Sequence, residues 1–241
     1  MGTHLVVVTG GSAGLGHALL AAAPAGATRI DVSRSGSGLD DVRHLRADLA
    51  DPAAWREVGD AIAAAVQGQT WRRITLVHNA GTLDPIGYAG EVDADAYTRN
   101  VLLNSAAPQV LGHRFLAAVR GLDAARELVM ISSGAARTAY AGWSSYGASK
   151  AAVDQWVRTV GAEQADRGGV RVLSVAPGVV ATGMQELIRS TSARDFPRVE
   201  RFHRRYEDSE LADPGEVADR LWALLEDDVP TGSVFDLRDR E

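Results

Sequence analysis

The chain has 241 residues, of which 46% are hydrophobic and 23% are charged, so it is long enough for one large folded domain and is not intrinsically disordered. Its 25 basic residues are outnumbered by 31 acidic ones, and the net charge of −6 argues against nucleic acid and anionic membranes as partners. Because the sequence lacks cysteine, disulfides, cysteine nucleophiles and thiolate metal sites are excluded.

The N-terminal segment bears on localisation. No basic segment or cleavage site precedes the first apolar run, Leu5–Val8, which argues against a signal peptide. No uninterrupted apolar stretch approaches the roughly 20 residues that a membrane-spanning helix needs. We therefore expect a cytoplasmic protein without a membrane segment.

Short runs of β-branched residues alternate with longer segments of helical period along the chain. This alternation is typical of a parallel sheet whose strands are joined by crossover helices. We therefore predict an α/β fold: a single Rossmann-type domain over residues 1–241, with a doubly wound parallel sheet of about seven strands and helices on both faces. The predicted strands are Leu5–Thr9, Arg29–Val32, His44–Ala47 (the weakest in pattern), Ile74–His78, Leu128–Ser132, Val170–Val175 and Val234–Leu237.

Three helices have clear sequence signals. Asp51 and Pro52 are typical of the N-cap and first position of a helix that Gly68 ends. Apolar residues recur at helical spacing from Val153 to Val160. Asp213 precedes a proline and a capping-box glutamate, and so predicts the start of the last helix.

One connection is longer than the others. Residues 185–211 separate the sixth strand from the last helix, where two to six residues are usual. Over Met184–Ala212 there are six arginines and six acidic residues, so the net charge of this segment is about zero. Because it follows the carboxyl end of a strand, where such sheets bind ligands, we interpret it as a lid or substrate wall. The alternative is a pair of surface helices with mixed charge.

A glycine-rich segment follows the first strand directly and opens a helix. Gly10, Gly14 and Gly16 form the spacing Gly-x-x-x-Gly-x-Gly, which differs from the Gly-x-Gly-x-x-Gly of many dehydrogenases. Glycine lets the backbone turn sharply and approach a pyrophosphate, whose charge is stabilised by the free N–H groups of a helix N-terminus. The segment therefore predicts a dinucleotide site.

The end of the second strand indicates which dinucleotide binds. An NAD site usually has an acidic residue here for the ribose 2′-hydroxyl. This chain has Ser33 and Arg34 instead, and a guanidinium suits the 2′-phosphate of NADP. Asp31, two residues earlier, argues mildly against NADP, and Arg34 could be a solvated loop residue. We predict NADP(H).

Five further segments carry polar groups at strand ends or on the helices that follow. They are Asn79-Ala80-Gly81, Asn104, Ser133, Tyr146-x-x-x-Lys150, and Pro177-Gly178 with Thr182. In this order, and together with the glycine segment, they resemble the short-chain dehydrogenase/reductase family across essentially the whole chain.

Apart from the resemblance, the residue types themselves predict a proton-transfer site. Tyr146 and Lys150 share a helix face because they are four residues apart. A free phenol has a pKa of about 10, and a neighbouring ammonium typically lowers such a pKa by about 1–3 units, toward the range useful for proton transfer. We therefore expect Lys150 to lower the pKa of Tyr146, and Ser133 to hydrogen-bond a substrate carbonyl oxygen. The alternative is an ordinary pair on a helix surface with a serine in a turn.

The resemblance implies further roles. Lys150 also binds the nicotinamide ribose, and Asn104 holds a water in a proton relay with Lys150; Asn100 is the alternative position for this residue. His78 replaces the first asparagine of the usual Asn-Asn-Ala-Gly, with little functional consequence expected. The expected cofactor contacts are Gly10, Ser12, Gly14, Leu15, Gly16, Arg34, Asp48, Leu49, Asn79, Ala80, Gly81, Tyr146, Lys150, Pro177, Gly178, Val180 and Thr182.

The second half more specifically resembles bacterial benzil reductases, in the segments Ser133–Ala136, Gly142–Ser144, Met184–Ser192, Asp195-Phe196, Glu200–Phe202 and Gly232–Leu237. It is also similar to sepiapterin reductases. The resemblance implies NADPH-dependent reduction of one ketone of an aromatic 1,2-diketone, as from benzil to (S)-benzoin, with Trp143 and Met184 as pocket walls. Core packing is the alternative interpretation of Trp143.

Other functions stay open at this point. The same fold and cofactor could serve another ketone, such as a pteridine, a quinone or a polyketide, and a non-catalytic NADP-binding sensor is the more distant alternative. The six histidines are scattered and predict no metal site. The family implies a homodimer or homotetramer acting on a small-molecule ketone.

Overall fold

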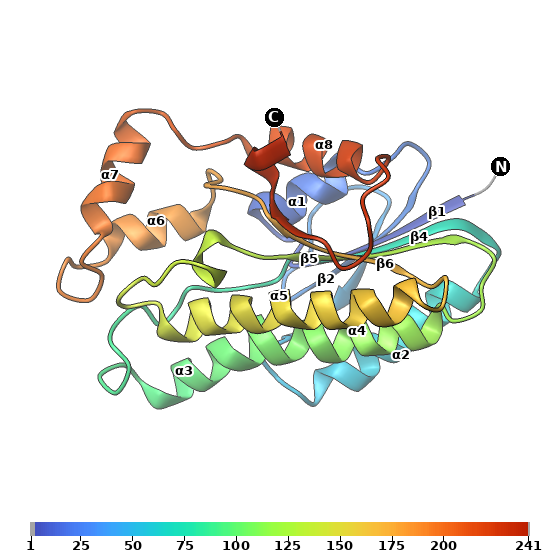
Figure 1. The fold of residues 1–241 in the computed structure, drawn as a ribbon, viewed down its shortest axis with the longest axis horizontal. Helices are drawn as coiled ribbons and strands as arrows, with labels where there is room; N and C mark the ends of the chain where they lie inside the picture. Colours follow the sequence, from blue (N-terminus) through green and yellow to red (C-terminus); the bar gives the residue numbers. More distant parts are fainter. Residues whose placement is uncertain (1–2, 241) are drawn as a thin grey trace.

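The computed structural model describes residues 3–240 as a parallel sheet covered by helices on both faces (Figure 1). Seven strands are hydrogen-bonded in the order β3-β2-β1-β4-β5-β6-β7, and every pairing is parallel. The predicted α/β fold with a doubly wound sheet is confirmed, and each predicted strand is present. The strands are β1 (Thr3–Thr9), β2 (Thr28–Ser33), β3 (Val42–Arg46), β4 (Trp71–His78), β5 (Ala125–Ile131), β6 (Arg171–Ala176) and β7 (Val234–Asp236).

The helices form two layers and a separate pair. As Figure 1 shows, α1 and α8 lie over one face of the sheet, α2, α3, α4 and α5 lie over the other, and α6 and α7 extend beyond the carboxyl ends of the strands. Within residues 3–240, no helix is long and apolar enough to cross a membrane. The α-helices are α1 (Gly14–Ala21), α2 (Ala54–Gln67), α3 (Ala94–Val101), α4 (Ala107–Ala118), α5 (Ser144–Ala165), α6 (Gly183–Ser190), α7 (Val199–Glu207) and α8 (Pro214–Leu224).

The alternation of side chains along each strand divides the core between the two faces. On β1, Leu5 and Val7 belong to the core beneath α2, α4 and α5, whereas Val6 and Val8 belong to the core beneath α1 and α8. All four side chains are fully buried, as expected for a central strand covered on both faces. The sheet is thereby a rigid platform for the loops at the carboxyl ends of its strands.

Strands β4 and β5 begin three residues earlier than predicted, because charged residues continue into the buried sheet. Glu127 on β5 is 3% exposed and accepts hydrogen bonds from Arg73 at 2.9 Å and from the Thr75 hydroxyl at 2.8 Å. Arg171 on β6 also pairs with it. Because arginines on the two neighbouring strands neutralise its charge, the Glu127 carboxylate can be buried in the sheet.

The N-terminus of α2 differs from the prediction. The helix begins at Ala54, and Asp51 is not its N-cap: the Asp51 carboxylate accepts the Ala53 N–H at 2.9 Å in a turn that precedes the helix. The predicted end at Gly68 is confirmed. At α8, Asp213 is the N-cap as predicted, and its carboxylate accepts the N–H groups of Gly215 and Glu216.

The Glu127 network yields a stability prediction. We expect Glu127→Gln to lower the free energy of unfolding by about 3 kcal/mol, because it leaves two partly buried guanidinium groups beside a neutral amide. Glu226→Gln is the matched control: Glu226 also pairs with Arg73, but its side chain is 68% exposed, so we expect a loss below about 1 kcal/mol. Urea unfolding measures both variants, and equal losses would contradict a buried role for Glu127.

Candidate active site

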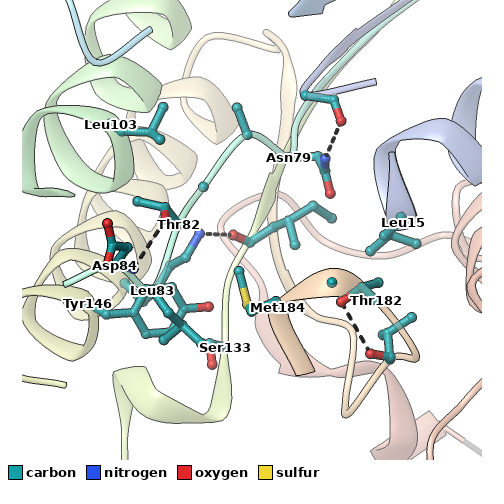
Figure 2. A pocket seen from close by; sticks show the side chains of 18 of the residues that line it. Leu15, Asn79, Thr82, Leu83, Asp84, Leu103, Ser133, Tyr146, Thr182 and Met184 are labelled. Carbon is teal, nitrogen blue, oxygen red and sulfur yellow. Dashed lines mark hydrogen bonds between the residues drawn. The ribbon is translucent and has the colours of Figure 1, made fainter. Parts of the chain in front are cut away.

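A cavity of about 800 Å³ opens at the carboxyl ends of the strands and is bounded by α6 and α7 (Figure 2). Figure 2 shows Ser133 and Tyr146 on one side of this space, Met184 facing them, and Leu15 and Thr182 beyond it. Every residue that the sequence analysis assigned to the site lines the cavity, except Gly16 and Asn104. The folded chain thus brings together segments from residue 10 to residue 184.

The glycine segment forms the floor of one end of the cavity. Gly10 has a φ of +73°, and a Cβ there would lie 2.9 Å from the Cα of Ala80, so a side chain would push the two loops apart. Gly16 faces inward instead: a Cβ there would lie 2.1 Å from the Gly10 carbonyl oxygen. Gly16 does not line the cavity, and its small size lets α1 pack against the glycine loop.

The N-terminus of α1 fits a phosphate group. Ala13 precedes the helix and provides no side-chain cap, so the first N–H groups of α1 keep their hydrogen-bonding capacity beside the cavity-lining Ser12 and Gly14. These donors and the positive end of the helix dipole match the pyrophosphate of a dinucleotide. The residues present therefore fit the cofactor that the glycine spacing predicts.

The end of β2 has two charged groups with different surroundings. Asp31 is fully buried, and its carboxylate accepts the Gly11 N–H at 3.0 Å and the Ser33 hydroxyl at 2.8 Å. It thus supports the glycine loop from beneath and is not directed at the cavity, which removes the sequence argument against NADP. Arg34 is exposed and lines the cavity, as does Asp48, which forms an ion pair with Arg99 at 2.8 Å. Nothing in the sequence pattern signals Arg99.

Tyr146, Lys150 and Ser133 lie together at the other end of the cavity. Helix α5 carries Tyr146 and Lys150 on one buried face, and the Lys150 Nζ lies 5.7 Å from the centroid of the Tyr146 ring. Lys150 donates a hydrogen bond to the carbonyl oxygen of Ile131 at 2.8 Å. Ser133 follows β5 directly and hydrogen-bonds with the Tyr146 hydroxyl.

The pKa of Tyr146 was predicted incorrectly. Burial raises the pKa of this phenol above its usual value of 10, and the hydrogen bond with Ser133 only partly opposes that rise. Lys150 does not reverse this rise: burial lowers the pKa of its ammonium to about 8, and its charged end donates a hydrogen bond to the Ile131 carbonyl. The prediction considered the spacing of the two residues but not the loss of water around both.

Asn104 lies behind the cavity wall, in a π-helical turn, Leu102–Ala106, between α3 and α4. Its amide accepts the Thr82 N–H at 3.0 Å and donates to the Thr82 carbonyl at 2.8 Å and to Asn100 at 2.9 Å, which leaves a second acceptor position on its oxygen. A Cβ on Gly81 would lie 2.8 Å from Asn104 Oδ1 and 3.6 Å from Lys150 Nζ, so the two side chains meet at this glycine. Asn100, the alternative, does line the cavity.

An aromatic cluster forms the wall near Tyr146. Trp143 stacks on Phe196, with ring centroids 4.6 Å apart and planes 3° apart, and lies 5.6 Å from Phe202 on α7. Trp143 is 7% exposed in this cluster and also lines the cavity, a position compatible with both core packing and the predicted pocket wall. Residues 185–211 include most of α6 and all of α7, and both helices border the cavity.

Sequence reasoning missed part of this wall. Tyr140 lines the cavity although no local pattern singles it out, whereas Phe202, which also lines it, lies within residues 185–211, the segment interpreted from the sequence as a lid or substrate wall. Besides Arg34 and Arg99, three further arginines line the cavity: Arg201, Arg205 and Arg238. None of the acidic residues in residues 185–211 lines it. Arg238 is held by Asp236 through two hydrogen bonds of 2.8 and 2.6 Å.

His78 ends β4 in a position without hydrogen-bond partners. Neither ring nitrogen has one within the described part of the chain, and the side chain is 4% exposed. Burial, and secondarily the charge of Lys150, lower the pKa of His78 from 6.5 to about 3, so the ring is neutral. Among residues 3–240, no group of three or more His, Asp or Glu side chains is placed to hold a metal ion.

This histidine predicts a pH dependence of stability. Between pH 6.5 and about 3, only the unfolded chain protonates this ring, so acidification favours unfolding by up to about 1.4 kcal/mol per pH unit. We expect His78→Asn to reduce that slope, measured by urea unfolding from about pH 7 to about pH 4.5. The exposed His113→Asn is the control and should leave the slope unchanged. An unaltered slope in His78→Asn would contradict the burial of a neutral ring.

Comparisons with known proteins agree with this arrangement. The family model for short chain dehydrogenase matches residues 4–193. The benzil reductase ((S)-benzoin forming) of Bacillus subtilis is 35% identical, over 98% of this chain and 99% of that protein. The sepiapterin reductase of Meriones unguiculatus is 33% identical, over 95% of this chain and 93% of its own length.

Solved structures share the fold over almost the whole chain. The crystal structure of the KRED1-Pglu enzyme matches with a TM-score of 0.82 and 27% identity, covering 96% of this chain and 100% of that chain. A short-chain dehydrogenase/reductase from Saccharomyces cerevisiae also matches with a TM-score of 0.82, at 25% identity. The chain therefore belongs to the short-chain dehydrogenase family, whose members are NAD(P)(H)-dependent oxidoreductases.

Proposed function

We propose that this protein is an NADPH-dependent carbonyl reductase that reduces one ketone of an aromatic 1,2-diketone. The observation that carries the proposal is the placement of Ser133 and Tyr146 beside the aromatic wall that includes Trp143, within a single cavity. Similarity to a benzil reductase over 98% of the chain supports the same substrate class. A planar aromatic ketone fits beside Trp143 with its carbonyl oxygen toward Ser133 and Tyr146.

The side chains divide the proton chemistry between them. The nicotinamide, when bound, supplies the hydride that the carbonyl carbon accepts. Ser133 donates a hydrogen bond that orients the carbonyl oxygen, and Tyr146 gives its hydroxyl proton to that oxygen as negative charge develops on it. Because burial raises the pKa of Tyr146, the phenol is protonated at neutral pH, the form that reduction requires.

Lys150 and Asn104 have supporting roles in this proposal. The ammonium of Lys150 stabilises the phenolate that remains on Tyr146 after proton transfer and holds the nicotinamide ribose. Asn104 is the preferred relay residue, since it meets Lys150 at Gly81. The cavity-lining position of Asn100 suits it to the wall rather than to the relay.

The cofactor preference follows from the end of β2. With Asp31 buried beneath the glycine loop, Arg34 is the charged residue of that strand end beside the cavity. A guanidinium binds a phosphate through paired, charge-assisted hydrogen bonds. We therefore propose that Arg34 binds the ribose 2′-phosphate, and that NADPH is preferred over NADH.

A second ketone class has specific support. The similarity to a sepiapterin reductase, at 33% identity over 95% of the chain, favours a pteridine bearing a side-chain ketone as the alternative substrate. Such a molecule is also planar and aromatic, and it would contact Trp143, Ser133 and Tyr146 in the same way.

The proposal predicts the outcome of one assay. We expect NADPH oxidation with benzil, followed by absorbance, with a single benzoin enantiomer as the product on chiral chromatography. Tyr146→Phe should lower kcat at least about 100-fold, because it removes the proton donor while keeping the ring. If benzil is not reduced while sepiapterin is, the alternative substrate class replaces the first. Failure of both, with NADPH bound tightly, would contradict the assignment of this site to aromatic ketones.

The role of Arg34 is tested separately. We expect Arg34→Ala to lower kcat/KM for NADPH by about 10–100-fold, the effect of losing a charged hydrogen-bond pair, and to change the value for NADH less than about threefold. Arg43→Ala on β3 is the control, because Arg43 is exposed and does not line the cavity. Equal losses with both cofactors would show that Arg34 does not read the 2′-phosphate.

A further inference from the structure

The face of α5 that carries Tyr146 and Lys150 continues to a third polar residue. Asp154 lies one helical turn beyond Lys150, as Lys150 lies one turn beyond Tyr146, and it is 3% exposed. Its Oδ1 accepts the hydroxyl of Ser174, on β6, at 2.6 Å. Ser174 is itself fully buried. A carboxylate is therefore fixed inside the protein beneath the candidate active site.

Burial of this carboxylate requires compensation. An unpaired ion in a protein interior is destabilised by several kcal/mol. Within residues 3–240, no arginine pairs with Asp154, and the Ser174 hydroxyl supplies a hydrogen bond but no charge. The interacting cation is Lys150, one turn away on the same helix face.

The groups around Lys150 include no other carboxylate. His78 faces it from β4 and is neutral, Ile131 of β5 presents a backbone carbonyl, and Asn104 approaches from the π-helical turn. On α5 itself the neighbour toward the cavity is Tyr146. Asp154 is thus the single negative charge that faces the ammonium from these elements.

We propose that Asp154, held by Ser174, is a positioning residue that keeps Lys150 protonated while the surrounding core excludes water. The inference rests on the proposed function, in which the ammonium of Lys150 stabilises the Tyr146 phenolate. Burial lowers the pKa of Lys150 to about 8, and the Asp154 charge raises that pKa in opposition. Without the carboxylate, the pKa of Lys150 would fall further, toward neutral pH, and the amine would lose its proton under working conditions.

The sequence offers a direct measurement. Lys150 is the single lysine among the 241 residues, so protein grown with lysine carbon-13-labelled at Cε gives one lysine side-chain resonance. Its chemical shift, followed against pH in the free protein, reports the pKa of Lys150. We expect a midpoint near 8 in the unaltered chain. In Asp154→Asn, which preserves shape and removes charge, we expect a midpoint lower by about 1 unit or more.

Ser174→Ala is the matched control for a purely structural role. It removes the hydrogen bond to Asp154 but leaves the charge, so we expect reduced stability with the Lys150 midpoint within about half a unit of the original. If Asp154→Asn does not fold by circular dichroism, Asp154→Ser takes its place, because its smaller neutral side chain fits the same space. An unchanged midpoint in the folded Asp154 variant, or an equal shift in Ser174→Ala, would overturn the proposal.

Activity gives a second readout. The alkaline limb of kcat/KM for ketone reduction should move to lower pH by the same amount as the resonance midpoint. If no ketone is reduced, the proposed function fails, but the resonance still decides whether Asp154 holds the proton on Lys150. If the resonance moves and the pH profile does not, the role of Asp154 in the reaction is overturned while the reductase assignment stands.

Discussion

Hydrogen bonds between the ends of β1 and β4 fix the relative positions of the two loops between which the site lies. The Thr9 hydroxyl accepts the N–H groups of Asn79 and Ala80 at 3.1 and 3.0 Å, and the Asn79 amide donates to the carbonyls of Thr9 and Gly10. Between these two central strands the sheet changes its winding direction, so the loops that follow them diverge and leave a crevice. Any shift between the two strand ends would displace the glycine loop relative to Lys150, and both halves of the site would lose their common geometry.

The cavity walls around Tyr146 come from different parts of the fold. Ser133, Tyr146 and Lys150 follow β5 or belong to the long helix α5, whereas much of the facing wall comes from α6 and α7, beyond the carboxyl ends of the strands. The stack of Trp143 on Phe196 joins the second group to the first. In the proposed function, this arrangement separates the groups that transfer the proton from those that contact the body of the substrate. The proposal therefore assigns selectivity among ketones mainly to the wall formed by α6 and α7.

Sequence reasoning succeeded where chemistry depends on local spacing and failed where it depends on burial. The strand positions, the glycine turn and the pairing of Tyr146 with Lys150 follow from residue order. The direction of the Tyr146 pKa does not, because it depends on how completely the folded chain removes water. Asp154 was missed for the same reason: in the sequence it resembles a polar residue on a helix surface, and only its bond to Ser174 reveals an interior carboxylate.

The π-helical turn Leu102–Ala106 bears on what a change in chain length at this position would do. A π-turn holds more residues than a turn of α-helix, so loss of one residue there would let α3 and α4 join as a regular helix. A π-turn takes up about one residue more than an α-helical turn for nearly the same rotation, so such a deletion would leave the faces of α3 and α4 in nearly the same relative orientation. Asn100 would keep its contact with Thr82, and Arg99 would keep its ion pair with Asp48. The extra residue therefore matters mainly for the turn itself, which carries Asn104, and little for the contacts of the helix that precedes it.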